Sequence, residues 1–422
     1  MTDVTVAGGG LAGLVAASRL AEAGRDVTVF EAEETVGGRV RSEHADGYTF
    51  DRGFQVVFDR YPAVKRELDI DALDLRRFSP GATIAKPGER SVLADPLRDP
   101  RTLTQTLFNR DVRFGDKLRI LRLRRELAHR DVQTILDPDR PDQTIKTFLA
   151  ERGFSRAFID RFAAPFYGGI TLDRSLSTDA RVFEYTFKML TAGAAAIPAD
   201  GMGAIPEQLA DRARNAGARI ETGATVEAVG ADGTVTVDGE TIDSDSVVVA
   251  TDPQTATELT GVETPPGTRG CATVYASLPS ETPLDTGSRL LLNATDDRPN
   301  QVAQLSSVAP EYAPDGEQLL AATFLGTPDE TDEQLFGEVR ETLDSWYPER
   351  SLSGLAHCRT ERVPFAQFDQ PPGFLASTPE PTAPDGSVVL AGDYTRWCSI
   401  QGALESGRVA ADLVSQSARE NY

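Results

Sequence analysis

Lysine is scarce in this chain of 422 residues. It occurs only at positions 65, 86, 117, 146 and 188, so arginine supplies almost all of the 43 basic side chains. Acidic residues number 65, which gives a formal net charge of −22. A surface this acidic repels nucleic acid and anionic lipid, so neither is expected as an electrostatic partner. The composition resembles that of halophilic proteins, and an ordinary acidic cytoplasmic protein is the alternative.

Cysteine and histidine are also rare, with three residues of each scattered along the sequence: Cys271, Cys358, Cys398, His44, His129 and His357. This spacing provides neither a disulfide framework nor a metal site, and we expect no metal. No run of about 18 apolar residues is present, and Met1 leads straight into a polar and then glycine-rich stretch without a signal peptide. We therefore expect a cytoplasmic protein without a membrane-spanning helix.

The N-terminal region does contain a regular pattern. Residues 4–7 form a short β-branched run, residues 11–23 carry apolar side chains at helical spacing, and residues 26–31 again read as a strand. The resulting βαβ unit has its turn at residues 8–13, Gly-Gly-Gly-Leu-Ala-Gly. This turn matches the dinucleotide-binding pattern.

Each residue of that pattern has a separate physical task. Gly8 allows the tight turn, Gly10 lets the backbone approach a pyrophosphate, and Gly13 lets the helix pack close to the sheet. Leu11 and Ala12 open the helix, whose free N–H groups and positive dipole end face the phosphates. Glu31, 23 residues after Gly8, closes the second strand and can accept hydrogen bonds from a ribose diol.

A second glycine motif favours FAD over NAD. The sequence Val-Gly-Gly-Arg-Val-Arg-Ser follows Glu31 and Ala32 at residues 36–42. Gly37 and Gly38 leave room for the backbone, and Arg39 can reach the pyrophosphate or position the flavin.

The combined motifs resemble the flavin-containing amine oxidase and phytoene desaturase superfamily, and most closely the plant-type phytoene desaturase-like FAD-dependent oxidoreductases. Further blocks along the chain carry the same resemblance: residues 51–64 (DRGFQVVFDRYPAV), 162–173 (FAAPFYGGITLD), 197–213 (IPADGMGAIPEQLADRA), 225–229 (TVEAV) and 390–411 (LAGDYTRWCSIQGALESGRVAA). The resemblance implies non-covalent FAD held by Gly8, Gly10, Leu11, Ala12, Gly13, Glu31, Ala32, Gly38, Arg39, Val226, Gly392, Asp393, Ile400 and Gln401.

Departures from the family pattern narrow the expected reaction. Gln401 stands where the family has glutamate, and Ser399 stands where amine oxidases carry an aromatic of the substrate cage. No lysine follows Lys188, although amine oxidases use one to hold a water at the flavin. Amine oxidation is therefore disfavoured. Cys398 lies beside the expected flavin site and is interpreted as a packed residue.

Two further patterns keep alternatives open. The helix expected at residues 116–127 carries Arg119, Arg122, Arg124 and Arg125 beside Leu118, Leu121 and Leu123, and its face is either solvated or docked on a membrane. Eight aromatic residues lie within residues 154–187. We expect most of them in the core, while some of them lining a tunnel for a long apolar substrate is the alternative.

We expect an α/β fold: a doubly wound, Rossmann-type FAD-binding domain from residues 1–84, 201–266 and 371–422, with an inserted α+β substrate domain from residues 85–200 and 267–370. By resemblance, the reaction is hydride transfer from a polyene or isoprenoid to the flavin, with oxygen, a quinone or another carrier as electron acceptor. No catalytic side chain is assigned, and Gln55 and Arg39 are expected near the flavin. A porphyrinogen oxidase, an amine oxidase and a flavin-bearing electron carrier without a substrate are the alternatives.

Overall fold

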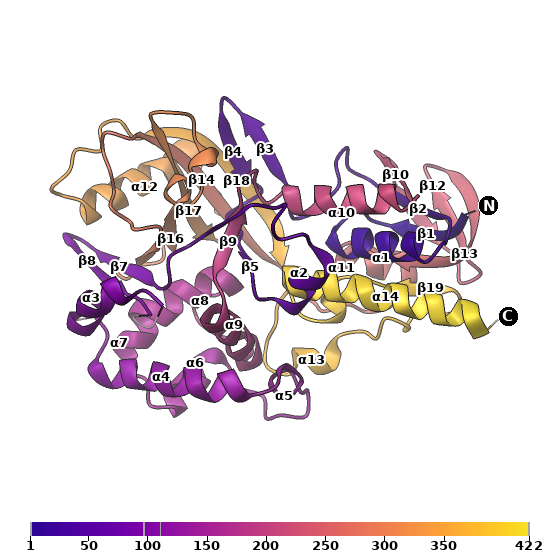
Figure 1. Cartoon of the computed structure of the whole chain (residues 1–422), viewed down its shortest axis with the longest axis horizontal. Helices are drawn as coiled ribbons and strands as arrows, with labels where there is room; N and C mark the ends of the chain where they lie inside the picture. Colours follow the sequence, from indigo (N-terminus) through magenta and orange to yellow (C-terminus); the bar gives the residue numbers. More distant parts are fainter. Residues whose placement is uncertain (1, 96–97, 110, 421–422) are drawn as a thin grey trace.

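The computed structural model describes residues 2–95, 98–109 and 111–420, and one half of it is built around a seven-stranded sheet (Figure 1). Strands β10, β2, β1, β13 and β19 run parallel in that order, and β13 also pairs antiparallel with the β11–β12 hairpin. The strands are β1 (Thr2–Ala7), β2 (Val27–Glu31), β10 (Arg219–Thr222), β11 (Val226–Val229), β12 (Thr234–Val237), β13 (Glu240–Val249) and β19 (Val388–Leu390).

This sheet has the doubly wound form that the sequence predicts. Buried valines face one another across the central strands, with Val6 in register with Val29 on one side and Val248 on the other. Such continuous apolar strands are typical of a parallel sheet covered on both faces. The pair Asp232-Gly233 in the sequence predicts a hairpin turn, and a turn at this position joins β11 to β12.

Three helices pack together beside this sheet: α1 (Leu11–Glu22), α10 (Ala204–Asn215) and α14 (Ile400–Glu420) (Figure 1). Small residues allow α1 and α14 to approach closely, and a Cβ atom on Gly407 would lie 2.2 Å from the Ala12 carbonyl oxygen. The N-terminal turn and the C-terminal helix, far apart in sequence, are thus neighbours.

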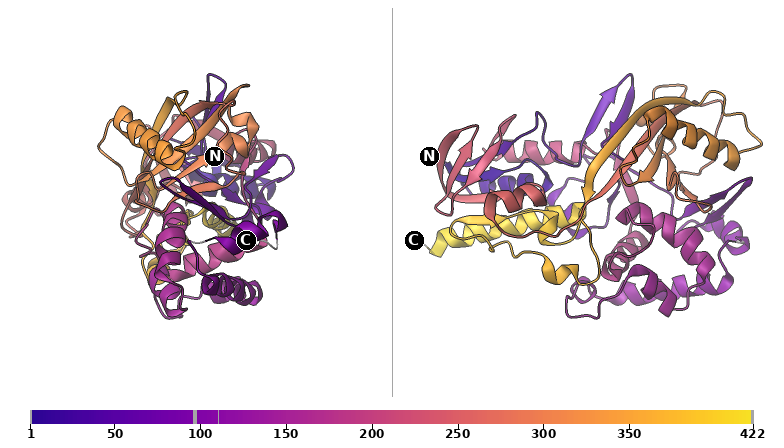
Figure 2. Two further views of the ribbon diagram at one scale, coloured as in Figure 1. Left: turned by 90° about the vertical axis from the view of Figure 1, so that its left-hand side faces the viewer. Right: turned by 180° about the vertical axis from the view of Figure 1, so that it is seen from behind.

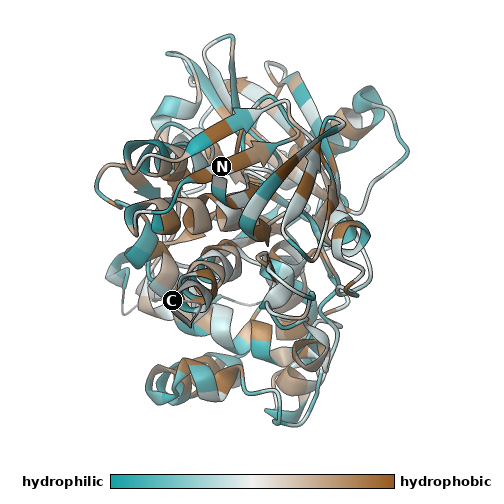
Figure 3. Ribbon diagram, turned by 90° about the vertical axis from the view of Figure 1, so that its right-hand side faces the viewer, coloured by the Kyte–Doolittle hydropathy of each residue, from teal (hydrophilic) through white to brown (hydrophobic). Residues whose placement is uncertain are grey.

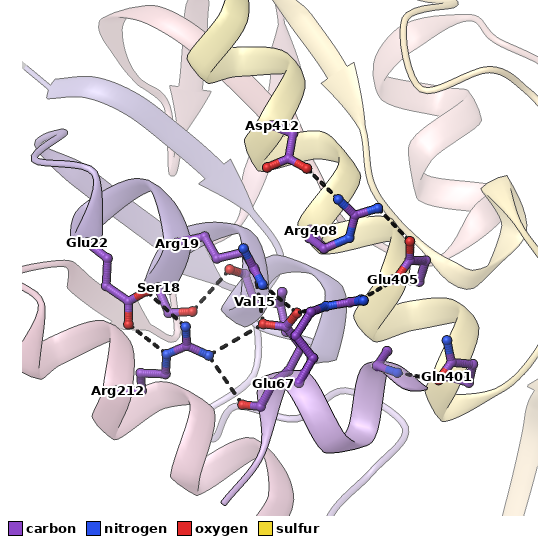
Figure 4. A network of polar contacts seen from close by, with 12 residues as sticks. Val15, Ser18, Arg19, Glu22, Glu67, Arg212, Gln401, Glu405, Arg408 and Asp412 are labelled. Carbon is purple, nitrogen blue, oxygen red and sulfur yellow. Dashed lines mark hydrogen bonds and ion pairs between the residues drawn. The ribbon is translucent and has the colours of Figure 1, made fainter. Parts of the chain in front are cut away.

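Buried ion pairs join these helices to α2 (Pro62–Glu67) (Figure 4). The Glu67 carboxylate is inaccessible to solvent and receives Arg19 at 2.7 Å, Arg66 at 2.8 Å and Arg212 at 3.4 Å. Arg66 also pairs with Glu405 on α14. The network therefore fixes α1, α2, α10 and α14 relative to one another.

The other half contains a second seven-stranded sheet, in the order β18-β14-β17-β16-β15-β7-β8, with α12 (Asp332–Trp346) packed against it. All neighbours are antiparallel except β15 and β7. The strands are β7 (Ala82–Lys86), β8 (Glu89–Leu93), β14 (Arg269–Pro279), β15 (Leu290–Asn293), β16 (Gln301–Gln304), β17 (Glu317–Leu325) and β18 (Ala356–Gln367).

A group of helices lies beneath the second sheet in Figures 1 and 2. It contains η1 (Pro100–Thr102), α3 (Leu103–Phe108), α4 (Phe114–His129), α5 (Val132–Ile135), α6 (Ile145–Glu151), α7 (Arg156–Phe158), the π-helical turn η2 (Ile159–Ala163), α8 (Ala164–Thr171) and α9 (Ala180–Ala192). The sequence pattern predicts a helix over residues 145–154, and α6 ends earlier because Gly153 adopts φ +78°.

The fold is completed by shorter elements: β3 (Ser42–Ala45), β4 (Tyr48–Asp51), β5 (Val57–Phe58), β6 (Leu75–Arg77), β9 (Ala195–Pro198), α11 (Pro253–Thr260), η3 (Leu305–Ser307), η4 (Pro310–Tyr312), α13 (Phe374–Ser377) and η5 (Asp393–Thr395). Hydrophobic residues concentrate on the inner strands and helix faces (Figure 3). Within the described part of the chain, no helix has the length and apolarity needed to span a bilayer.

Candidate active site

One cavity of about 1010 Å³ reaches from the parallel sheet into the helical group. Its inner end lies where parallel strands finish: Gly8 follows β1, Ala32 follows β2, Thr251 lies two residues past β13 and Gly392 lies two residues past β19, and all four line the cavity. Ligands of open α/β sheets bind at this carboxyl edge. The strand order thus places the predicted motifs around one space.

The glycine turn at residues 8–13 opens onto that space. A Cβ atom on Gly10 would meet no protein atom within 4 Å, whereas a Cβ atom on Gly13 would lie 2.0 Å from the Gly8 carbonyl oxygen. Gly10, Leu11 and Ala12 line the cavity, while Gly13 lies behind them against the turn. The start of α1 is therefore open to a phosphate, and Gly13 serves the packing beneath it.

Glu31 is held in place by its own backbone surroundings. Its Oε2 accepts the Gly9 N–H at 2.7 Å and its Oε1 accepts the Glu33 N–H at 2.9 Å. The side chain is buried and lines the cavity. Each oxygen keeps a lone pair beyond these bonds, so the carboxylate can accept hydrogen bonds from a diol.

Arg39 and Asp393 meet across the cavity wall. Arg39 Nη2 donates to Asp393 Oδ1 at 2.7 Å, and Nη1 donates to the Ala366 carbonyl at 3.0 Å. Although burial disfavours the charged arginine, the Asp393 carboxylate outweighs it and raises the pKa of Arg39. Gln55 supports this arrangement, since its Nε2 donates to the Arg39 carbonyl at 2.8 Å. All three predicted residues line the cavity.

The remaining predicted residues divide into two groups. Ala32, Gly38, Val226, Gly392 and Ile400 line the cavity, but Gln401 does not. The Gln401 Oε1 instead accepts the Ala63 N–H at 2.8 Å and ties α14 to α2 (Figure 4). The side chain at this position therefore faces α2, and the role of its backbone toward a flavin stays a prediction.

The outer part of the cavity is aromatic. Phe154, Phe158, Phe162 and Phe166 stack in succession with ring centroids 4.7, 5.4 and 5.3 Å apart, and we call them the phenylalanine stack. All four rings line the cavity, and Tyr167 and Phe183 extend the wall. Phe158, Phe162 and Phe166 lie about one helical turn apart along α7, η2 and α8, and Phe154 precedes α7. Phe154 and Phe158 are buried and also line the cavity, while passage of a long apolar substrate along these rings stays a prediction.

Sequence reasoning missed one wall entirely. Residues 363–367 on β18 line the cavity, together with Cys271 on β14. These residues carry no motif that the sequence alone reveals. The apolar run at residues 247–250 does predict a buried strand, and its position beside β1 would point to Thr251 at the strand's carboxyl end.

Both thiols at the cavity are weak nucleophiles. Burial raises the pKa of Cys271 to about 11, and burial next to Asp393 raises the pKa of Cys398 further above the usual range. The thiolate is the reactive form of cysteine. Neither side chain is therefore activated for covalent attachment to a ligand.

Comparisons with known proteins agree with this geometry. The sequence profile of a family described as flavin containing amine oxidoreductase matches residues 11–415. Phytoene dehydrogenase from Streptomyces griseus is 32% identical over 290 residues, which cover 61% of this chain and 56% of that protein. Carotenoid 3,4-desaturase from Haloarcula japonica is 43% identical over 83 residues, which cover 18% of this chain and 17% of that protein. The first of these matches spans about half of the relative's length.

Among solved structures, an oxidoreductase from Methanosarcina mazei superposes with a TM-score of 0.72. The match covers 97% of this chain and 99% of that chain at 18% identity. This similarity identifies the fold but not the reaction.

Proposed function

Because the chain belongs to the family of flavin-containing amine oxidoreductases, we propose that it is an FAD-dependent oxidoreductase that takes hydride from an apolar substrate. We further propose that this substrate is a polyene or isoprenoid of the carotenoid type, which is desaturated or isomerised. The desaturases of Streptomyces griseus and Haloarcula japonica support this substrate class.

The observation that carries the proposal is the continuity of the cavity. A single space is bounded at one end by the residues of the glycine turn, Glu31 and Arg39, and at the other by the phenylalanine stack. A long apolar chain lying along the stack would reach the inner end of the cavity. Stacked phenyl rings provide an apolar wall and leave no hydrogen-bonding group unsatisfied against such a chain.

The residues present fit FAD. The start of α1 would receive the pyrophosphate, and Glu31 would bind the adenosine ribose. Val226, the first residue of β11, lines the cavity and would contact an adenine. Bound FAD would supply the hydride acceptor, the N5 atom of its ring system. The weakly nucleophilic Cys271 and Cys398 support non-covalent binding.

The protein itself would contribute to the reaction by orienting the reactants and by excluding water from the cavity. Hydrogen bonds hold Arg39 and Gln55 in place, because Arg39 donates to Asp393 and Gln55 donates to the Arg39 carbonyl. Among the described residues, no histidine lines the cavity. We therefore assign no proton-transfer group and propose that orientation and exclusion of water accelerate hydride loss.

Two further proposals concern the electron acceptor and the division of the chain into domains. Oxygen, a quinone or another carrier would reoxidise the flavin, since only one dinucleotide motif occurs in the sequence. We propose that residues 1–84, 201–266 and 371–422 bind FAD and that residues 85–200 and 267–370 bind substrate. The β5-β9-β6 pairing links these two parts, because β9 belongs to the second and its partners to the first.

Amine oxidation receives less support. Ser399 lines the cavity at the position where amine oxidases carry a cage aromatic, and Lys117, on α4, is the lysine that the described lining contains. Lys117 donates to the Asn109 carbonyl. A cationic substrate nitrogen would lack the cage aromatic whose position Ser399 occupies.

Anaerobic flavin reduction tests the proposal. Purified protein loaded with FAD is mixed with a carotenoid precursor in detergent, and absorbance of the oxidised flavin near about 450 nm is followed. Bleaching by the polyene, without bleaching by primary amines or porphyrinogen, supports the proposal. Bleaching by an amine alone would indicate an amine oxidase, and bleaching by a porphyrinogen alone would indicate a porphyrinogen oxidase. Bleaching by no donor would indicate a flavin-bearing electron carrier.

A further inference from the structure

Helix α4 carries the large hydrophobic side chains that the described residues expose most. Phe114 is 62% exposed, Leu118 is 52% exposed and Leu121 is 44% exposed. Their spacing of four and three residues places them along one side of the helix. Leu123, which the sequence groups with them, is buried on the opposite side. We call Phe114, Leu118 and Leu121 the apolar ridge.

Exposed arginines accompany the apolar ridge, and exposed acids do not. Arg122 and Arg125 are exposed on α4, and Arg113 is exposed at its N-cap. The two acidic residues of α4 are engaged elsewhere: Asp116 is buried and accepts from Ser155, while Glu126 pairs with Arg130. The outward face of α4 is thus apolar and basic in a chain whose net charge is −22.

The cavity reaches the same helix. Leu121 is both part of the apolar ridge and part of the cavity lining, together with Lys117, Ile120 and Arg124 of α4. Leu190 and Thr191, at the end of α9, line the cavity as well. Figures 1 and 2 place α4 on the outer edge of the molecule, on the side away from both termini. The mouth of the cavity therefore adjoins the apolar ridge.

We propose that the outward face of α4 docks on an anionic lipid bilayer and that the apolar substrate passes from the bilayer past Leu121 into the cavity. This inference rests on the proposed function, because it takes the substrate to be an apolar molecule dissolved in lipid. The apolar ridge would enter the acyl region, and Arg122 and Arg125 would contact lipid phosphates.

The overall acidity of the chain does not oppose this contact. Charges separated by more than about 8 Å are largely screened at physiological ionic strength, so the residues nearest the lipid decide the interaction. A protein partner is a poorer match, since a stable interface buries roughly 800 Å² on each side and needs a complementary shape. A bilayer imposes no such requirement on a single amphipathic helix.

Vesicle sedimentation tests the docking directly. The FAD-loaded protein is spun with phosphatidylcholine vesicles and with vesicles containing phosphatidylglycerol. We expect the wild type to pellet with the anionic vesicles. Phe114→Ser with Leu118→Ser, and separately Arg122→Gln with Arg125→Gln, should each weaken binding about tenfold or more, because apolar area or charge is lost.

The matched control carries Arg214→Gln and Arg219→Gln, which remove two arginines of 50% and 53% exposure far from α4 in sequence. It should bind as the wild type does. A wild type that stays in the supernatant, or α4 variants that pellet normally, would overturn the proposal. So would gel filtration in which the wild type forms a dimer that Phe114→Ser with Leu118→Ser converts to a monomer, because the apolar ridge would then be covered by a second copy.

Substrate delivery separates this inference from the proposed function. The Phe114→Ser, Leu118→Ser variant should oxidise a polyene in detergent at the wild-type rate and lose about tenfold with the polyene embedded in anionic vesicles. Equal loss in both media would contradict delivery through α4. Vesicle binding without any polyene oxidation would leave the docking supported and remove the proposed reaction.

Discussion

Arg39 and Asp393 form an ion pair of 2.7 Å although 354 positions separate them in the sequence. The pair joins the segment after β2 to the segment after β19. It is the point at which the N-terminal and C-terminal motifs of the chain meet at the cavity.

Replacing Arg39 with alanine should abolish retention of FAD. Asp393 is 3% exposed, and breaking a buried pair leaves a charge that costs roughly 3–5 kcal/mol. The ratio of flavin to protein after purification measures the effect. Arg41→Ala is the control, because Arg41 pairs with the exposed Glu33 and does not line the cavity. Normal flavin content in Arg39→Ala would contradict the expected role.

Gly10 and Gly13 should respond to substitution in opposite ways. Gly10→Val places its side chain in open space at φ −74°, so the apoprotein should keep its melting temperature and fail to bind FAD. Gly13→Ala forces its Cβ atom into a backbone oxygen and should destabilise the fold by about 1–3 kcal/mol or more. Differential scanning calorimetry and flavin titration distinguish the two. A Gly10→Val protein that retains FAD would show that nothing approaches this turn.

The buried carboxylate of Glu67 should be a stability determinant. Burial alone would raise its pKa, but hydrogen bonds from Arg19 and Arg66 outweigh burial and lower the pKa of Glu67. Glu67→Gln should cost about 3–5 kcal/mol of unfolding free energy, since three arginines lose their counter-charge. Urea denaturation measures this. Glu22→Gln, which removes one partly exposed partner of Arg212, should cost under about 1 kcal/mol.

Asp51 should make stability depend on pH between about 4 and 6. Burial raises the pKa of Asp51 to about 6, despite hydrogen bonds from Ser42, Met202 and Tyr312. The native state therefore keeps a proton that the unfolded state releases, so this stabilisation is complete below pH about 4 and is lost as pH rises through about 6.

The pH dependence is measured as the unfolding free energy of the wild type minus that of Asp51→Asn. The difference should fall by roughly 3 kcal/mol at most between pH 4 and 7. The exposed Asp243→Asn is the comparison and should show no such change. A flat difference for Asp51→Asn would mean that burial does not raise the pKa of Asp51 above its value in the unfolded chain.

The phenylalanine stack should determine turnover of a long substrate. Phe162→Ala removes two stacked contacts and should lower kcat/KM for a polyene about tenfold, because each aromatic pair contributes about 0.5–1.5 kcal/mol. The flavin content should not change, since the stack lies away from the glycine turn. Unaltered kcat/KM would place the substrate elsewhere.

The half of the molecule built on the parallel sheet could be largely predicted from sequence. The glycines of the turn and Glu31 are local signals, since each follows a recognisable strand and its position is fixed by parallel pairing. The side-chain direction of Gln401 could not be predicted, because it depends on Ala63 approaching from α2. Residues 363–367 were missed for the same reason, as they become cavity wall only through the pairing of β18 with β14.

The other half, which contains α4 and the phenylalanine stack, could be predicted less completely from sequence. A stripe of leucines on α4 predicts an amphipathic helix, but only packing decides that Leu123 turns inward and Leu121 reaches the cavity mouth. The phenylalanine spacing likewise predicts a helical face and not whether that face is filled by protein or by a ligand.

The neighbouring positions of α1 and α14 constrain the order in which a chain like this matures on the ribosome. The wall formed by Gly8, Gly10 and Arg39 emerges first, and the wall formed by Gly392, Asp393 and Ile400 emerges after more than 300 intervening residues. A flavin captured by the early wall alone would have one side of its site missing. With the proposed site, cofactor loading would therefore be a late event in biosynthesis, and stalled or truncated chains would be released colourless.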